Sequence, residues 1–91
     1  KIIGWDVYMP LAWAYWVEFI APTNYPQQTY KYTLTVYLDN KVVFSDEQYP
    51  GDKARWEFWM NVGKKNKLRA SLQYEDTASI SFPIILRIIK L

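Results

Sequence analysis

The sequence YKYTLTVYLDNKVVFS, residues 30–45, contains two alternating runs on either side of a turn signal. Every second residue from Tyr30 to Leu38 is tyrosine, leucine or valine, and most of the residues between them are lysine or threonine. A period of two is typical of a β-strand with one buried face. Asp39 and Asn40 both tolerate left-handed backbone angles, which suits a two-residue hairpin turn. This stretch therefore predicts a β-hairpin.

Five further segments show strand patterns and are separated by turn residues. They are Ile2–Val7, Leu11–Ala21, Arg55–Val62, Leu68–Tyr74 and Ile80–Leu91. The sequence therefore predicts an all-β fold, an immunoglobulin-like antiparallel β-sandwich of about seven strands, formed by a single domain over residues 1–91. The chain begins with Lys1 rather than Met, so we expect a processed form or a fragment of a longer chain.

Alternation also predicts which side chains point into the sandwich, because successive residues of a strand face opposite sides. The expected core positions are Trp13, Tyr15, Val17, Phe19, Tyr30, Tyr32, Leu34, Val36, Leu38, Trp56, Phe58, Met60, Val62, Leu68, Ala70, Leu72, Tyr74, Ile80, Phe82, Ile84, Leu86 and Ile88. In a sandwich of this kind the second and fifth strands are neighbours in one sheet. We therefore expect Leu11–Ala21 to pair with Arg55–Val62.

Three of these segments also resemble a known family. The matching pieces are YTLTVYLDNKVVF at 32–44, ARWEFWMNV at 54–62 and KLRASLQYED at 67–76, with Pro50-Gly51-Asp52 between the first two. Through them the chain resembles the immunoglobulin-like domains of the CARDB type, found in archaeal and bacterial cell-surface proteins. The resemblance implies a sandwich fold, an extracellular location and an adhesive or spacer role, and it supplies no catalytic residue.

The composition argues against catalysis. The chain has no histidine and no cysteine, so the commonest general base, the commonest metal ligand and any thiolate nucleophile are missing. It has 3 glycines, and they form no phosphate-binding loop. We therefore predict that the protein is not an enzyme, and that it has no catalytic residue, no cofactor and no metal site.

Two acidic pairs and one basic run have simpler interpretations than ligand binding. Asp46-Glu47 and Glu75-Asp76 offer oxygen ligands of the kind that calcium takes, but the spacing of a calcium-binding loop is absent, which favours solvated turns. The basic run at 64–67 lies in a predicted hairpin loop, and the net charge is only +2. Because the net charge is so low, the basic run is better interpreted as a hairpin loop that keeps the protein soluble. We predict no nucleic-acid partner.

The two longest apolar stretches are too short to cross a membrane. Leu11–Ala21 and Ile80–Leu91 each have about half of the ~20 residues that a spanning helix needs. Both stretches also contain charged residues. We therefore predict no membrane span.

The most informative residues are apolar side chains that alternation places on the outside. Half of the chain is hydrophobic, with 51% apolar and 19% aromatic residues. More apolar groups are present than we expect a lone two-layer domain to cover, and a strand that is apolar on both faces is normally covered on both. Such outward residues recur on the second, fifth and last strands. With Tyr37 of the hairpin, the predicted interaction surface comprises Trp16, Ile20, Tyr37, Trp59, Ile85 and Ile89.

This surface leads to three functional hypotheses. The first is a non-enzymatic structural or adhesive module of an extracellular, cell-surface, filament or virion assembly, whose partners are neighbouring subunits or domains. The second is a carbohydrate-binding module in which Trp16, Tyr37 and Trp59 form a stacking platform. The third is an accessory domain that docks onto an enzyme. The alternative is that these residues form no contact surface, because scattered exposed apolar residues are normal on folded proteins.

Overall fold

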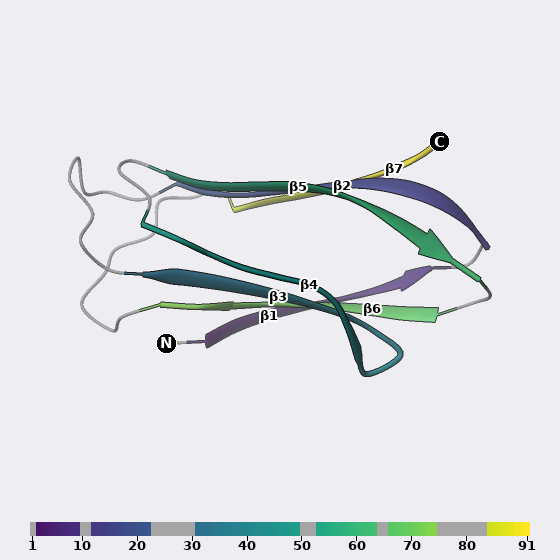
Figure 1. Ribbon diagram of the computed structural model, residues 1–91, viewed down its shortest axis with the longest axis horizontal. Helices are drawn as coiled ribbons and strands as arrows, with labels where there is room; N and C mark the ends of the chain where they lie inside the picture. Colours follow the sequence, from purple (N-terminus) through teal and green to yellow (C-terminus); the bar gives the residue numbers. More distant parts are fainter. Residues whose placement is uncertain (1, 10–11, 23–30, 50–52, 64–65, 75–83) are drawn as a thin grey trace.

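The computed structural model describes residues 2–9, 12–22, 31–49, 53–63, 66–74 and 84–91, which form two antiparallel sheets packed face to face (Figure 1). The strands are β1 (Ile2–Met9), β2 (Trp13–Pro22), β3 (Tyr32–Leu38), β4 (Lys41–Gln48), β5 (Lys53–Val62), β6 (Asn66–Gln73) and β7 (Ile85–Lys90). The described residues contain no helix, so the prediction of an all-β fold is confirmed. It also follows that none of them forms a helix able to cross a bilayer.

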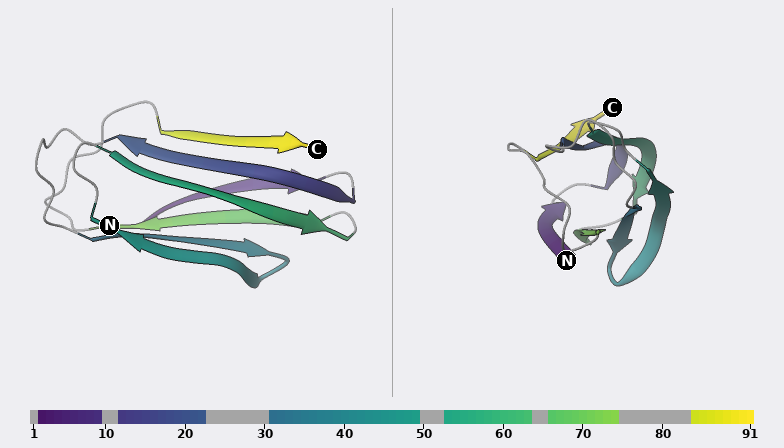
Figure 2. Two further views of the ribbon diagram at one scale, coloured as in Figure 1. Left: turned by 45° about the horizontal axis from the view of Figure 1, so that its top comes forward. Right: turned by 90° about the vertical axis from the view of Figure 1, so that its left-hand side faces the viewer.

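The two sheets differ in size and are built from strands that are distant in sequence. One sheet has four strands in the order β1-β6-β3-β4, and the other has three in the order β5-β2-β7. Figure 2 shows β2 between its two neighbours in the smaller sheet. The predicted pairing of the second and fifth strands is confirmed, with Trp16 opposite Trp59 and Phe19 opposite Trp56.

The predicted hairpin is present, and its turn has the expected backbone. Asp39 and Asn40 have φ angles of 50° and 66°, and Leu38 pairs with Lys41 across the turn. Positive φ at both central residues defines the type I′ turn, whose twist matches that of the two strands. The Asp39 carboxylate also accepts the Lys67 backbone N–H at 3.2 Å, which ties the turn to β6.

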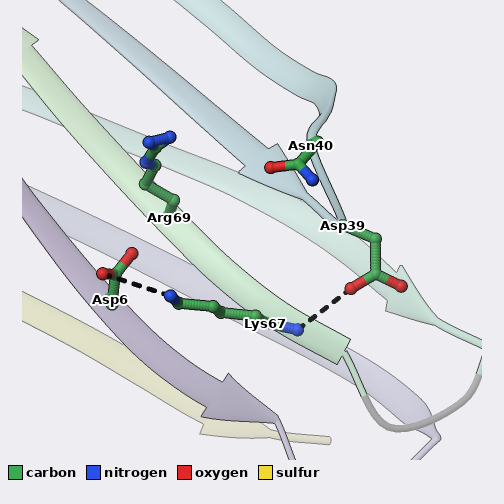
Figure 3. Close-up of a pocket in the computed structure, with 5 residues that line it drawn as sticks. All are labelled: Asp6, Asp39, Asn40, Lys67 and Arg69. Carbon is green, nitrogen blue, oxygen red and sulfur yellow. Dashed lines mark hydrogen bonds and ion pairs between the residues drawn. The ribbon is translucent and has the colours of Figure 1, made fainter.

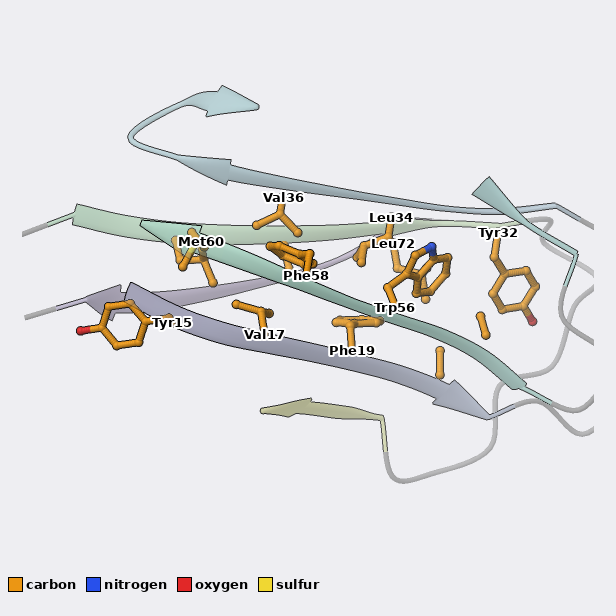
Figure 4. Close-up of a cluster of buried hydrophobic side chains, with 14 of the residues drawn as sticks. Tyr15, Val17, Phe19, Tyr32, Leu34, Val36, Trp56, Phe58, Met60 and Leu72 are labelled. Carbon is orange, nitrogen blue, oxygen red and sulfur yellow. The ribbon is translucent and has the colours of Figure 1, made fainter. Parts of the chain in front are cut away.

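The core lies between the sheets and follows the predicted alternation (Figure 4). The buried apolar residues are Met9, Tyr15, Val17, Phe19, Ala21, Tyr32, Leu34, Val36, Ala54, Trp56, Phe58, Met60, Val62, Leu68, Ala70, Leu72 and Tyr74. The predicted inward residues of β7, Ile84, Leu86 and Ile88, pack against this cluster and are partly buried. Tyr30, Ile80 and Phe82 lie outside the described residues.

Aromatic contacts join the two sheets at the centre of the core. The Phe19 ring packs edge-on against Trp5 at 5.0 Å and lies 6.0 Å from Trp56. Phe44 of β4 stacks on Phe58 of β5 with ring centroids 4.2 Å apart. Phe19 therefore links strands of both sheets, and its burial should contribute strongly to stability.

Two details of the prediction were wrong. Asp46-Glu47 was expected in a turn, but β4 continues through these residues to Gln48. The extension is stabilised because Asp46 accepts the Trp56 indole N–H at 3.1 Å. Trp13 was expected in the core, but its side chain is 50% exposed. It lies at the start of β2, where its indole donates to the Leu91 carbonyl instead.

A side chain of β4 occupies part of the free edge of β5. The Gln48 amide nitrogen donates to the Arg55 carbonyl at 2.6 Å, and the Arg55 backbone N–H donates to the Gln48 amide oxygen at 3.2 Å. The amide therefore takes the place that the backbone of a neighbouring strand would have. Because the ladder alternates, the backbone groups of Glu57, Trp59 and Asn61 also point away from β2.

We expect Gln48→Ala to lower the free energy of unfolding by about 1–2 kcal/mol, because both backbone groups of Arg55 lose their partner. Urea unfolding followed by fluorescence measures the change. Gln48→Glu is the matched control, because it keeps the acceptor oxygen and loses the donor. Its free energy of unfolding should lie between those of the wild type and the alanine variant. An alanine variant as stable as the wild type would show that the amide contributes nothing.

Candidate functional site

The outer face of the β5-β2-β7 sheet collects most of the predicted surface residues. The strand register places Trp59, Trp16 and Ile89 side by side in one row across the three strands. It places Ile20 beside Ile85 in a second row four pairs further along. We call these five residues, Trp16, Ile20, Trp59, Ile85 and Ile89, the tryptophan face.

Exposure is concentrated in the first row of the tryptophan face. Trp59 is 68% exposed and Ile89 is 37% exposed, whereas Trp16 is half-buried between them. The Trp16 and Trp59 rings meet edge to face, with centroids 5.0 Å apart and planes at 71°. Ile20 and Ile85 are half-buried. The sandwich therefore leaves a continuous apolar row in solvent, with a bulky indole at its centre.

A charged row separates the two apolar rows. It contains Glu57, Glu18 and Arg87, again side by side on β5, β2 and β7. The Glu18 carboxylate lies 3.5 Å from the Arg55 guanidinium and accepts the Trp16 indole N–H at 3.3 Å. The Arg55 guanidinium also donates to the Glu57 carboxylate at 2.6 Å. Only 13% of the Glu18 side chain is exposed, so these partners hold it in a fixed position.

Arg87 completes the charged row but takes no part in this network. Its side chain is exposed, and it forms no ion pair with any residue that the structure describes. Glu18, Glu57 and Arg55 together have a net charge of −1, and Arg87 has +1. These four charges cancel overall: those of Arg55 and Glu57 cancel on β5, β2 carries the negative charge of Glu18, and β7 carries the positive charge of Arg87.

The C-terminal end of β7 is fastened to the start of β2. The Leu91 backbone N–H donates to the Ala14 carbonyl at 3.0 Å, and the Trp13 indole N–H donates to the Leu91 carbonyl. The Lys90 ammonium lies 4.4 Å from the centroid of the Trp13 ring. These contacts hold β7 against β2 and so keep Ile89 and Arg87 in the face.

Tyr37 does not belong to this surface. It lies on β3, in the other sheet, where the Arg69 guanidinium lies 5.8 Å from the centroid of its ring. The expected platform of Trp16, Tyr37 and Trp59 is therefore not formed. The two tryptophans that do meet are tilted rather than coplanar, which gives a sugar ring no flat double platform.

A polar depression of about 380 Å³ lies at the opposite sheet (Figure 3). It is lined by Asp6, Asp39, Asn40, Lys67 and Arg69. The Lys67 ammonium lies 3.4 Å from the Asp6 carboxylate, and the Lys67 backbone N–H donates to Asp39. Two acidic and two basic side chains balance here. Their contacts hold the hairpin turn against β6, and they assemble no nucleophile with a base.

The remaining candidates from the sequence are engaged in structural contacts. Glu47 lies 3.3 Å from the Lys31 ammonium, and Asp46 binds Trp56 as described above. Glu75-Asp76 and the first two lysines of the basic run lie outside the described residues. Within the described part of the chain, no three acidic side chains are grouped as metal ligands would be.

Sequence reasoning missed the Glu18–Arg55–Glu57 network and the contacts of Trp13. Glu18 alone gave a signal, because it is the single charged residue inside an otherwise apolar strand. Its partner comes from β5, more than thirty residues away, and alternation says nothing about which side chains meet across strands.

The sequence matches no protein-family model and no curated protein.

Proposed function

We propose that the protein is a non-enzymatic structural or adhesive module that contacts a neighbouring protein through the tryptophan face. One observation supports this above all: Trp59 stands 68% exposed beside Trp16 and Ile89 in a single apolar row. Tryptophan is enriched at the centres of protein interfaces, where it forms a large contact with little loss of conformational entropy. The setting we propose is an extracellular, cell-surface, filament or virion assembly; of these, the family resemblance implies the extracellular, cell-surface location.

The strand order supports a variant of the immunoglobulin-like sandwich. The neighbours β2–β5 and β3–β6 correspond to the central strand pairs of such domains. The terminal strands differ, because β1 pairs with β6 and β7 pairs with β2. In the immunoglobulin arrangement the first strand shares a sheet with the second, and the last with the sixth. This exchange gives β7 its place at the edge of the tryptophan face.

A protein partner fits this face better than a carbohydrate does. Sugars stack on the flat side of an aromatic ring, but Trp16 and Trp59 meet edge to face and Tyr37 is on the other sheet. A protein surface can pack around such a ridge and can pair with the charged row beside it. The geometry therefore favours the first hypothesis over the platform for glycans.

A photo-reactive amino acid at position 59 tests the proposal in the cells or particles that make the protein. We expect cross-links to protein from position 59 and none from position 69, an exposed site on the outer face of the other sheet. Equal cross-linking from both positions would contradict the proposal. So would adducts to polysaccharide alone.

A further inference from the structure

We infer that the side of the sandwich bounded by β1 and β7 joins a second copy of this chain, strand beside strand, about a twofold axis parallel to the strands. β1 and β7 are edge strands of different sheets, and the right-hand view of Figure 2 shows them on the same side, away from β4 and β5. None of the described strands pairs with the outer edge of either one. The contact is separate from the tryptophan face and goes beyond the function proposed above.

The opposite side of the sandwich is closed by contacts between its own edge strands. The Gln48 amide of β4 binds the edge of β5, and Phe44 stacks on Phe58 between the sheets. The β3–β4 ladder also contains a register shift, an irregularity that blunts a free edge. By contrast, β1 and β7 pair with their neighbours in unbroken register over their described lengths. Their outer edges therefore keep the regular form that another strand can extend.

The inward side chains of β1 and β7 are less well covered than those at the centre of the core. Almost all inward residues of β2, β5 and β6 are buried. Ile3, Trp5 and Val7 of β1 are only partly buried, and so are Leu86 and Ile88 of β7. The apolar core is therefore partly exposed along this side, and a neighbour with matching edges would gain free energy by covering it.

A backbone hydrogen bond shows which groups of β7 face its free edge. The Leu91 N–H donates to the Ala14 carbonyl, so the Leu91 backbone faces β2. Successive residues of a strand face alternate sides, so the backbone of Arg87 also faces β2. The N–H and C=O groups of Leu86 and Ile88 therefore point to the free edge, while their side chains point into the core.

The same reasoning applies to β1. The Asp39 N–H donates to the Lys67 carbonyl, so the Lys67 backbone faces β3 and that of Ala70 faces β1. Trp5 is the partner of Ala70, and its backbone therefore faces β6. The residues just before and after Trp5 have the opposite orientation. Their N–H and C=O groups point to the free edge, and their side chains point outwards from the sandwich.

A second copy of the chain matches both free edges at once. The two sheets are ~10 Å apart, so one extended peptide can pair with only one of the edges. A twofold axis parallel to the strands exchanges the sheets, and it places β7 of each copy beside β1 of the other. β1 and β7 run in the same direction, so both new ladders are parallel (Figure 1).

The backbone directions of the two strands fit a parallel ladder. In such a ladder, residues at one level point their side chains to the same face and their backbones in opposite directions. The outward residues of β1 turn their backbones towards the free edge, whereas those of β7 turn theirs towards β2. When these residues lie level, each N–H and C=O group at the contact meets a partner.

The level of the two strands follows from a contact in the core. The Trp5 ring packs against Phe19 with centroids 5.0 Å apart, and Phe19 pairs with Leu86. Trp5 and Leu86 are therefore about level, and so are the residues that follow them, Asp6 and Arg87. An axis parallel to the strands keeps each residue at its level. Asp6 of each copy then comes beside Arg87 of the other.

Charge supports this pairing, which occurs twice in each dimer. Arg87 has no ion pair among the described residues. Asp6 lies near Lys67 through its Oδ2 atom, and its second oxygen can accept Arg87. Arg69, the neighbour of Asp6 on β6, lies over the Tyr37 ring on β3. An axis perpendicular to the sheets would instead pair β1 with β1 and β7 with β7, and Arg87 would not meet Asp6.

Two exposed apolar side chains also meet in this register. Tyr8 on β1 is 64% exposed, and Ile89 on β7 is 37% exposed. Each lies two residues beyond its charged neighbour, Asp6 or Arg87, so the two come side by side in each new ladder. The dimer therefore buries apolar surface on the outer faces as well as between the sheets.

The size of the contact suggests a weak dimer. The overlap is limited by the 6 residues of β7, and two ladders of that length supply about ten hydrogen bonds, as in a typical specific interface. The flat area is roughly 20 Å by 20 Å on each copy, or about 800 Å² in total, which is at the low end for specific contacts. We therefore expect dissociation in the micromolar to millimolar range.

Proline at position 4 tests whether the edge of β1 is used. We expect Gly4→Pro to raise the dissociation constant at least about tenfold, because each ladder loses a hydrogen bond and the ring fills space that the neighbour needs. The fold should tolerate it, since this N–H faces the free edge. Gly4→Ala is the matched control, because it keeps the N–H and its methyl would lie 3.8 Å from the Ala70 carbonyl oxygen, an ordinary contact. Sedimentation velocity from micromolar to millimolar concentration measures all three proteins.

Cross-linking tests the register. The chain has no cysteine, so Tyr8→Cys and Ile89→Cys each introduce a single thiol. Under mild oxidation an equimolar mixture should form a disulfide-linked heterodimer, because the two thiols lie on adjacent strands at one level. Each variant alone should form far less, because its two thiols lie on opposite outer faces of the dimer. Mixing Tyr8→Cys with Val42→Cys, a similarly exposed site on β4, controls for random collision.

Three results would overturn the inference. They are a wild-type chain that stays monomeric at millimolar concentration, a dimer that Gly4→Pro leaves intact, and a mixture of thiol variants that yields no more heterodimer than the control. None of them bears on the tryptophan face, which is tested by cross-linking from position 59. Trp59 lies on β5, two strands from the new contact, so Trp59→Ser should leave this dimer unchanged.

Discussion

Replacing Phe19 by alanine is expected to lower the free energy of unfolding by about 3–5 kcal/mol. The ring is 1% exposed and contacts Trp5 of one sheet and Trp56 of its own, so its removal leaves a cavity where the layers meet. A domain of 91 residues has a total stability of about 5–14 kcal/mol. The loss is therefore at least about a fifth of the total stability. Urea unfolding monitored by tryptophan fluorescence measures it.

The conservative variant Phe19→Leu separates the loss of volume from the loss of the aromatic ring. It keeps most of the apolar contact and should be clearly more stable than the alanine variant. If the alanine and leucine variants both had nearly the wild-type free energy of unfolding, Phe19 would not occupy the tightly packed centre that the structure shows.

Trp59→Ser is expected to have a large effect on association and a small effect on the free energy of unfolding, which is the reverse of what we expect for Phe19→Ala. Loss of the exposed indole should raise the dissociation constant for association through the tryptophan face about 30-fold or more, because a large exposed aromatic side chain is lost from the contact. Stability should fall by about 0.5–1.5 kcal/mol, because the main intramolecular loss is the edge-to-face contact with Trp16. Sedimentation equilibrium and urea unfolding measure the two effects separately.

Tyr49→Ser is the matched control for this substitution. Tyr49 is also 68% exposed, but it follows β4, which belongs to the other sheet. Its removal should leave association unchanged. A loss of association as large as that of the tryptophan variant would indicate non-specific contact between exposed aromatic rings.

Alternation predicted the class of the fold because each strand has one face that must be buried. The inward residues of β2, β5 and β6 are buried as expected, with Trp13 as the exception. The ends of strands were harder to predict. Residues Asp46 to Gln48 read as a turn by composition, but their side chains bind Trp56 and Arg55, and such distant partners leave no local pattern.

The same reasoning explains the partial success at the candidate site. The positions of Trp16 and Trp59 on one face follow from alternation, and their pairing follows from the expected order of strands. Tyr37 was grouped with them because it also points outward, yet outward side chains of a sandwich belong to two separate surfaces. Only the assignment of each strand to a sheet decides which surface a side chain joins.

The pairing of the terminal strands, β1 with β6 and β7 with β2, also determines how the domain would carry a load. The chain enters at one end of a body 40 Å long and leaves at the other, through strands that run in the same direction (Figure 1). A force pulling on both termini would slide β1 along β6 and β7 along β2. Hydrogen bonds between strands lie across that direction, so they would resist together instead of opening in turn. Single-molecule stretching should therefore show one high rupture force per domain. Gradual unfolding at low force would contradict this expectation. A high rupture force would suit a domain that links other parts of an assembly under tension.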